Sequence, residues 1–304
     1  QDYPNFEVVL INDNSHDDTL EIMELFANEH NHVKIVNVAP NKAFLSNKKY
    51  ALTLGIKASN HNFLLLTDAD CKPNSKYWLK EMSSHFSNTK TIVLGFGAYS
   101  KINKSFLNKL IRFETVLAAI QYFSYSKAGT PFMGVGRNLA YRKNEFFNIN
   151  GFQSHMQIPS GDDDLFINQV ATDTNTAICF SKDSFTYSNP KTSYSSWLTQ
   201  KRRHISTAKH YQLKHKVILT LFFISQFLFW ILAFILLLST FHWKITLALI
   251  SIRFIVFYII YIPTLKKLDE KDLLVYLPLL EFFLIGTQLV IFINNLITKP
   301  KHWK

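Results

Sequence analysis

Residues 62–70 read Asn-Phe-Leu-Leu-Leu-Thr-Asp-Ala-Asp, and they say most about the architecture of this chain. The apolar run is short and lacks helical periodicity, so it predicts a buried strand. Asp68 and Asp70 would then follow the carboxyl end of that strand, which is where open α/β sheets bind their ligands. The sequence therefore places a candidate site at these two carboxylates.

Strands and helices alternate on both sides of this stretch. The pattern predicts strands at 6–11, 33–38, 63–67 and 91–95, separated by helices at 17–30, 47–59 and 75–86. Such alternation is typical of βαβ units, so we expect an α/β fold with a mostly parallel sheet of the nucleotide-binding type. The stretch 106–125, rich in Phe and Tyr, fits a helix in the membrane interface and a packed core helix equally well.

Three apolar segments follow this polar part of the chain. Residues 217–240 carry no charged side chain and exceed the roughly 20 residues that span a bilayer. Residues 245–262 are apolar except for Arg253, and residues 273–297 except for Glu281. We therefore expect a catalytic domain at 1–210, followed by a membrane region at 211–304 with two or three hydrophobic segments.

The net charge of +11 would fit a nucleic-acid partner, but much of the excess lies at 201–216 and 299–304, beside the apolar segments. Positive residues kept on the cytoplasmic side of a membrane explain this placement. We expect an integral membrane protein with a cytosolic catalytic domain and no nucleic-acid partner. If the basic tail is cytosolic too, the crossings must be even in number. One of the three segments, with 273–297 as the first choice, would then be re-entrant or interfacial. Alternatively, the tail lies outside.

Two further features of the chain limit its class. Cys71 and Cys179 are its only cysteines, which excludes a disulfide framework and a cysteine-rich zinc site. The sequence begins with Gln1 directly before a strand, with neither an initiator Met nor a signal peptide. We expect that a first strand is missing.

Three charged clusters carry the candidate chemistry. Asp68 and Asp70 offer the oxygen ligands that Mg²⁺ and Mn²⁺ prefer, although a loop or capping role before the next helix is an alternative. Residues 161–164, Gly-Asp-Asp-Asp, precede an apolar helix start whose dipole would stabilise acids. Three adjacent carboxylates exceed what capping needs, and their repulsion raises at least one pKa, which suits a general base.

The third cluster is Gln-Lys-Arg-Arg at 200–203, on a helix that leads to the first apolar segment. An arginine here can grip a diphosphate through two parallel hydrogen bonds. The alternative is a basic collar at the membrane, which we prefer for Lys209, Lys214 and Lys216.

Together these segments resemble membrane-bound family 2 glycosyltransferases of the GT-A fold, the group that includes cellulose, chitin and hyaluronan synthases. The likeness covers nearly the whole chain. It implies that Asp13 contacts the nucleotide base, with Asn12 in place of the family's first acid. Residues 47–52, Asn-Lys-Lys-Tyr-Ala-Leu, are similar to the family's Gly-Lys-x-x-Ala-Leu, which makes Lys48 the lysine on the nucleotide side.

The resemblance also implies roles for the clusters. Asp70 would coordinate the metal, Asp68 would contact nucleotide or metal, and Asp163 would be the catalytic base, with Asp162 as the neighbouring alternative. Gln200 and Arg203 match QxxRW at the donor diphosphate, and His204 stands where the family has a tryptophan at the acceptor platform. The loop beside the sugar pocket matches Gly136, Arg137 and Asn138.

The resemblance implies an inverting glycosyltransferase that uses Mg²⁺ or Mn²⁺. The donor would be a nucleotide-diphosphate sugar, with a UDP-sugar favoured, and the acceptor lipid-linked or a saccharide at the cytosolic membrane face. Two alternatives stay open. One is an inactive scaffold that binds nucleotide sugars, and the other is a membrane-anchored basic protein that binds nucleic acid or anionic lipid.

Overall fold

The apolar run at 62–67 forms strand β3 (Phe63–Leu66), as the sequence predicts. The computed structural model describes residues 1–39, 48–158 and 160–298. The other strands are β1 (Val8–Asn12), β2 (Val33–Asn37), β4 (Cys71–Pro73), β5 (Ile92–Leu94), β6 (Gly97–Tyr99), β7 (Leu139–Arg142), β8 (Thr176–Ile178) and β9 (Thr186–Ser188).

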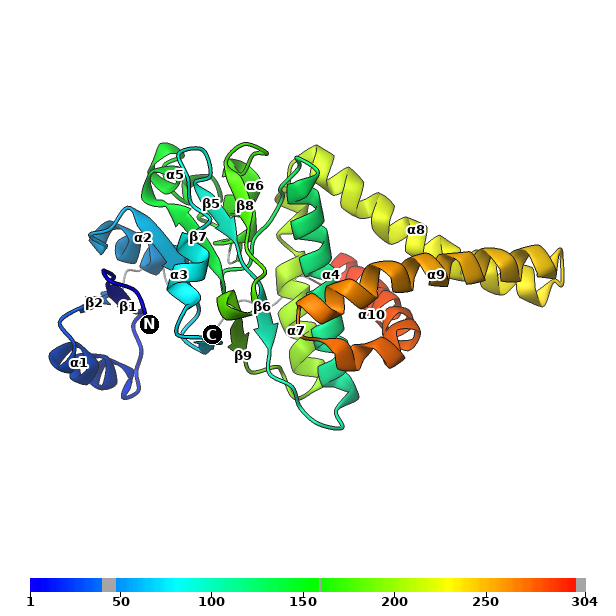
Figure 1. The fold of residues 1–304 in the computed structure, drawn as a ribbon, viewed down its shortest axis with the longest axis horizontal. Coiled ribbons are helices and arrows are strands. Elements are labelled where there is room, and N and C mark those ends of the chain that lie inside the picture. The colour runs from blue at the N-terminus through cyan, green and yellow to red at the C-terminus, as the bar shows by residue number, and fades with distance from the viewer. Residues whose placement is uncertain (40–47, 159, 299–304) are drawn as a thin grey trace.

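Helices cover these strands, and every described element from Tyr194 onward is a helix (Figure 1). The α-helices are α1 (Thr19–Glu29), α2 (Lys48–Ala58), α3 (Trp78–Ser83), α4 (Phe106–Lys127), α5 (Lys143–Asn148), α6 (Asp164–Val170), α7 (Tyr194–Ile205), α8 (Leu213–Leu238), α9 (Trp243–Lys267) and α10 (Leu277–Ile297). Short 3₁₀ turns are η2 (Gln153–His155), η3 (Lys182–Ser184), η4 (Ala208–His210) and η5 (Lys271–Tyr276).

Strands and helices alternate along the chain, which confirms the predicted α/β class. The prediction of a mostly parallel sheet is wrong for the sheet around β3, because that sheet is mixed. Its strand order is β3-β7-β5-β8. β7 runs antiparallel to β3 and to β5, while β5 and β8 run parallel. β7 follows the long helix α4 and the segment 128–138, and it does not belong to a parallel βαβ unit. β1 and β2 form a separate parallel pair, and β4, β9 and β6 form a third small sheet.

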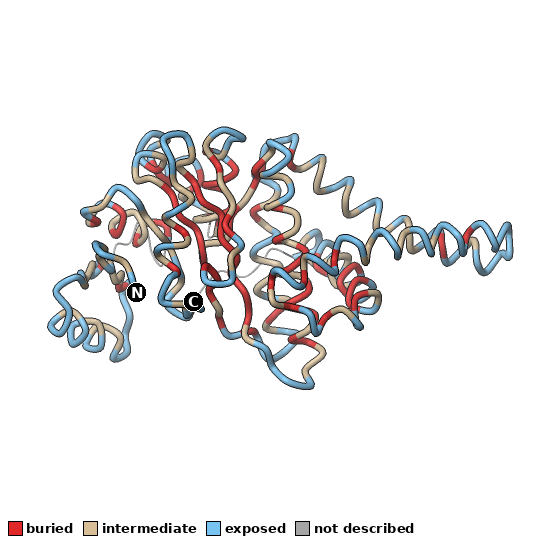
Figure 2. Tube along the Cα trace, in the orientation of Figure 1, coloured by how far each residue is buried: buried red, intermediate tan, exposed pale blue. Residues whose placement is uncertain are grey.

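The helix α4 forms much of the core. Ser105 begins it by accepting a hydrogen bond from the backbone N–H of Asn108 at 3.1 Å. Leu110, Ile111 and Phe113 of α4 are at most 1% exposed, and burial of each such side chain stabilises the fold by about 1.5–3 kcal/mol. Figure 2 shows buried residues concentrated here and in the neighbouring strands. Of the two alternatives for 106–125, the packed core helix is confirmed.

The three apolar segments form helices long and apolar enough to cross a membrane. The helix α8 begins earlier than the predicted 217, and α9 continues through Pro263 to Lys267. These two helices form a hairpin that projects from the body of the molecule, whereas α10 lies against that body (Figure 1). Most of the hairpin's residues are exposed or only partly buried (Figure 2).

Candidate active site

The two acidic clusters meet at one lysine. At the start of α2, Lys48 places its Nζ 2.9 Å from Asp68 Oδ1 and 2.9 Å from Asp162 Oδ2. Burial disfavours the charge on this amine, but the carboxylates of Asp162 and Asp68 outweigh that effect and raise the pKa of Lys48. Although burial also opposes the charge of Asp162, the lysine lowers the pKa of that carboxyl. Lys48 and Asp162 are therefore a charged pair at neutral pH.

The neighbouring Asp163 has a different environment. Its Oδ2 accepts a hydrogen bond from the backbone N–H of Gly136 at 2.7 Å, and its Oδ1 accepts one from the N–H of Asp164 at 2.7 Å. Burial, reinforced by the charges of Asp162 and Asp164, raises the pKa of Asp163 to about 7. A carboxyl group with such a pKa can take up and release a proton near neutral pH.

A glycine sets the turn that leads into this acidic segment. Gly161 has a φ of +99°, in the region that side chains rarely adopt. A Cβ there would lie 2.5 Å from Leu165 Cδ1, inside the first turn of α6. Glycine thus allows Asp162 and Asp163 to approach the start of the helix closely.

The third acid, Asp164, is structural. It is 8% exposed, and its Oδ2 accepts hydrogen bonds from the hydroxyls of Thr207 and Tyr211, the latter at 2.7 Å. These bonds tie the start of α6 to the segment that follows α7. The three adjacent aspartates therefore have three different environments.

A lysine that sequence reasoning missed holds the loop before the acidic segment. Lys49 Nζ donates hydrogen bonds to the carbonyl oxygens of His155, Ile158 and Ser160, at 2.8, 2.8 and 2.7 Å. The residue is 1% exposed, and burial lowers the pKa of its amine to about 8. Its position contained a usable clue, because Lys49 lies on the same helical stripe as the apolar Leu52 and Ile56.

The first acidic cluster fits a hard divalent cation. Ligand atoms of Asp68, Asp70 and Cys71 lie within 4.8 Å of one another. Burial raises the pKa of the Cys71 thiol to about 11, so the sulfur stays protonated and the two carboxylates are the suitable ligands. Oxygen donors are the set that Mg²⁺ and Mn²⁺ prefer.

The segment 136–138 connects several strands around the acids. The Arg137 guanidinium donates to Ser188 Oγ at 2.7 Å and lies 4.1 Å from the centroid of the Tyr99 ring. Asn138 is fully buried, and its amide donates to the carbonyls of Phe96 and Ser184 and accepts from Trp78 Nε1. The placement of Asn138 beside a sugar therefore needs correction, since its side chain is engaged inside the protein and joins the sheets.

The helix α7 divides its polar residues between two tasks. Gln200 and Arg203 are three residues apart and share a face, and the charge of Asp162 acts on the Arg203 guanidinium. Lys201 instead forms an ion pair with Glu114 of α4, and Arg202 binds the end of α10. These two residues of the basic cluster hold helices together.

Two further predicted site residues come from different parts of the fold. Asp13 is exposed and follows β1, in the separate two-stranded sheet, and His204 is exposed on the last turn of α7. Asn47, predicted to precede Lys48 in the nucleotide-side motif, lies outside the described residues.

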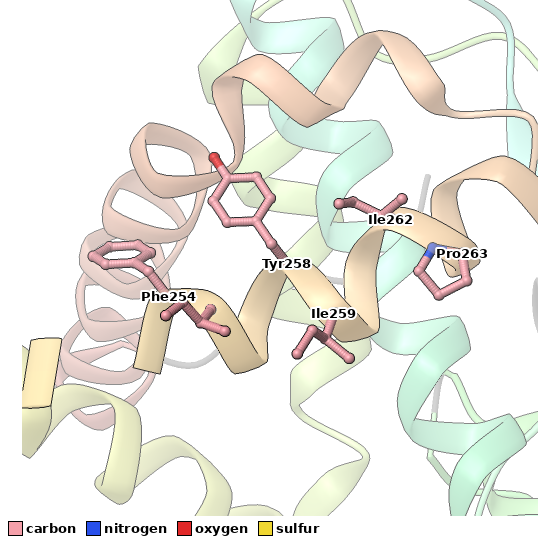
Figure 3. A pocket seen from close by; sticks show the side chains of 6 residues that line it. Phe254, Tyr258, Ile259, Ile262 and Pro263 are labelled. Carbon is pink, nitrogen blue, oxygen red and sulfur yellow. The ribbon is translucent and has the colours of Figure 1, made fainter. Parts of the chain in front are cut away.

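A hollow of about 570 Å³ lies on α9, away from this chemistry (Figure 3). It is lined by Phe254, Ile255, Tyr258, Ile259, Ile262 and Pro263. None of these side chains is charged, so the hollow does not suit a diphosphate. Its lining is typical of a surface in contact with lipid.

The model of glycosyl transferase family 21 matches residues 1–304. No curated protein sequence matches this chain. Among solved structures, the chain is similar to the mannosyltransferase PcManGT from Pyrobaculum calidifontis in complex with GDP-Man and Mn²⁺. That likeness has a TM-score of 0.53 at 17% identity and covers 93% of this chain and 80% of the other. It confirms the GT-A type of α/β fold that the resemblance implied.

A more distant likeness is to S. aureus TarS 1-349 in complex with UDP, with a TM-score of 0.44 at 18% identity. It covers 71% of this chain and 61% of the other.

Proposed function

This chain belongs to glycosyl transferase family 21, and we propose that it is an inverting enzyme that transfers a sugar from a nucleotide-diphosphate donor, preferably a UDP-sugar, to a hydroxyl of a lipid-linked or saccharide acceptor. The main support is the arrangement at Lys48. This residue joins the carboxylates that follow β3 to those that precede α6, beside a carboxyl group, Asp163, whose pKa is raised to about 7.

In the proposed reaction, Asp163 removes the proton of the acceptor hydroxyl. The acceptor oxygen then attacks the anomeric carbon from the side opposite the diphosphate, and the bond from that carbon to the leaving oxygen breaks. Proton removal by a positioned base typically contributes 10²–10⁴-fold to such a rate. Asp162 is the alternative base, but its pairing with Lys48 lowers its pKa and makes it the weaker base of the two.

Positive groups would stabilise the departing nucleoside diphosphate. Lys48 and Arg203 carry the charge, and Gln200 shares the face of Arg203. Mg²⁺ or Mn²⁺ held by Asp70 and Asp68 would add positive charge at the same diphosphate. PcManGT, the neighbour at TM-score 0.53, is in complex with GDP-Man and Mn²⁺, which supports this cofactor.

The remaining predicted residues would define the ends of the site. Asp13 would contact the nucleotide base, whereas Gly136 and Arg137 would lie beside the sugar and His204 on the acceptor side. We further propose that residues 1–210 form the catalytic domain on the cytosolic face and that the membrane region at 211–304 keeps it beside a lipidic acceptor. The three apolar helices support a membrane location.

The test is release of nucleoside diphosphate from a panel of UDP- and GDP-sugars by detergent-purified protein. Native lipid extract serves as acceptor, with Mn²⁺ or Mg²⁺ and then with EDTA. We expect metal-dependent release with one donor, lost in Asp70→Ala and in Asp163→Asn, and retained in the surface control Asp173→Asn. Undiminished release by the Asp163→Asn, Asp162→Asn double variant would reject the assigned base. Donor binding without release from any donor would favour the inactive scaffold.

A further inference from the structure

The loop and the turn η5 that lead into α10 are held by the part of the chain that carries the paired carboxylates. Asp269, in the loop between α9 and η5, accepts hydrogen bonds from Lys182 Nζ at 2.9 Å and, through its carbonyl, from Lys101 Nζ at 2.6 Å. Next to it, Glu270 forms a buried ion pair with Arg112 of α4, whose Nη1 also lies 2.9 Å from Asp272 Oδ2. Arg112 and Glu270 are 2% and 3% exposed on their side chains, so this attachment is internal.

The other end of α10 is held by the same body. Arg202 of α7 donates from Nε to Asn295 Oδ1 at 2.9 Å and from Nη2 to the carbonyl of Thr298 at 2.7 Å. Arg202 belongs to α7, the helix that also carries Gln200 and Arg203. The last turn of α10 is therefore attached to a helix of the proposed catalytic body.

The length of α10 makes these two attachments incompatible with a crossing. A helix of 21 residues is about 32 Å long, close to the roughly 30 Å hydrocarbon core of a bilayer. If α10 crossed, one end would be separated from the catalytic body by the whole membrane. Instead Lys182 and Arg202, one at each end, both belong to that body.

The two faces of α10 differ in exposure. Leu277, Leu280 and Leu284 are at most 3% exposed and pack into the core. The opposite face is apolar and uncovered within the described residues, at alternating spacings of four and three: Leu279, Phe283, Gly286, Val290, Ile293 and Ile297. Such a surface on the same molecule as two candidate membrane helices is suited to contact with lipid.

An ion pair of the buried residue Glu281 places α10 beside the membrane hairpin. Arg253 of α9 binds Glu281 of α10 through two hydrogen bonds, at 3.0 and 2.5 Å. The Trp230 ring of α8 lies 5.9 Å from the Phe282 ring, centroid to centroid. The apolar hollow on α9 adds further uncharged surface to the hairpin.

From these contacts we infer that α10 does not cross the membrane but lies in its interface, on the side of the catalytic body, with its exposed apolar face covered by the lipid of one leaflet. The hairpin of α8 and α9 then provides the crossing helices. Of the three apolar segments, the one at 273–297 is thus the interfacial one.

The first test uses the full chain in membranes, with Cys71 and Cys179 replaced by serine and one cysteine introduced at Lys271, at Thr298 or at Lys191 as the comparator in the catalytic body. A membrane-impermeant maleimide is applied to sealed vesicles of each orientation. We expect Lys271→Cys and Thr298→Cys to react from the same side as Lys191→Cys. Reaction of Thr298→Cys from the opposite side would overturn the inference.

The second test measures the depth of spin labels in proteoliposomes, from their accessibility to oxygen and to a water-soluble nickel complex. Labels at Leu279, Gly286 and Ile293 should share one shallow depth, on the order of 5–10 Å below the headgroups. A maximum of depth at Gly286, with both flanking labels shallower, would show a crossing helix and refute the interfacial position.

Discussion

The surroundings of Asp163 change its acid–base chemistry. Because its pKa is raised to about 7, we expect kcat/KM to increase as pH rises through about 7 and then to level off, since only the ionised carboxylate accepts a proton. The charge of Asp162 contributes to this pKa, so Asp162→Asn should shift the profile to lower pH. The pH dependence of nucleotide release measures both effects. An unshifted profile in Asp162→Asn would contradict the coupling between the two acids.

The same pKa predicts a stability effect with a definite sign. Between its ordinary value of 3.8 and about 7, the native protein holds a proton on Asp163 that the unfolded chain releases, so this group makes stability fall as pH rises through that window. Asp163→Asn removes that loss. The variant should be inactive. Thermal unfolding in detergent should show that its stability, relative to the parent, is higher at pH 8 than at pH 5. A gain that is larger at pH 5 would be inconsistent with a raised pKa.

Lys49 is predicted to act through position rather than contact with substrate. Lys49→Met would leave the carbonyl oxygens of His155, Ile158 and Ser160 without their donor, and these residues would no longer hold the acidic segment in place. We expect kcat to fall at least tenfold, with donor affinity nearly unchanged because Lys48 remains. Lys57→Met, an exposed position on the same helix, is the matched control. Equal effects of the two changes on kcat would eliminate the positioning role.

At the scale of elements, the early part of the chain could be predicted because its strands and helices have clear periods. The helix α2 and the strands β1, β2, β3 and β5 lie where the pattern indicates, to within one or two residues. The three-residue strands β4, β6, β8 and β9 are too short to show alternation, and their pairing depends on distant partners. The antiparallel insertion of β7 was missed for the same reason, since strand order is a tertiary property.

The motifs around the site show a similar division. The acidic clusters pointed to Asp68 and Asp162, and the family resemblance added Lys48, which the fold joins to both carboxylates through ion pairs. The resemblance also assigned Asn138 to the sugar pocket, because a motif gives no information on which side chains turn inward. In the same way, the motif did not distinguish Lys48, which is exposed, from Lys49, which is buried.

The helix α7 allows a direct comparison of two neighbouring arginines. Arg203→Gln should lower kcat/KM by roughly 10- to 100-fold, the effect of losing a hydrogen bond between charged groups at the diphosphate. Arg202→Gln should leave the donor affinity unchanged and lower the melting temperature, because Arg202 holds Asn295 and Thr298 of the α10 end. Kinetics and thermal unfolding of both variants separate the roles. Weakened donor affinity in Arg202→Gln alone would reverse the assignment.

For the whole molecule, the decisive connection is the one between the catalytic body and the membrane helices. Several contacts link the two parts, namely the Arg112 pairs with Glu270 and Asp272, the Lys182 pair with Asp269, and the attachment of Arg202 to α10. The stacked rings of Phe113 and Tyr261 add an apolar contact between α4 and α9. The α9–α10 loop is therefore part of the folded body.

Loss of the buried arginine should accordingly affect the entire protein. Arg112→Leu leaves the carboxylate of Glu270 buried without its partner, and such a change typically destabilises a protein by about 3–5 kcal/mol. Lys101→Ala removes exposed ion pairs of the same cluster and an exposed hydrogen bond to the Asp269 carbonyl, and it should cost about 1 kcal/mol. Thermal unfolding in detergent, combined with limited proteolysis at the α9–α10 loop, distinguishes the two variants. Because Arg112→Leu/Glu270→Leu buries no lone charge, it should recover much of the lost stability. If the double variant is no more stable than Arg112→Leu, the loss comes from packing of α4 and not from the unpaired carboxylate.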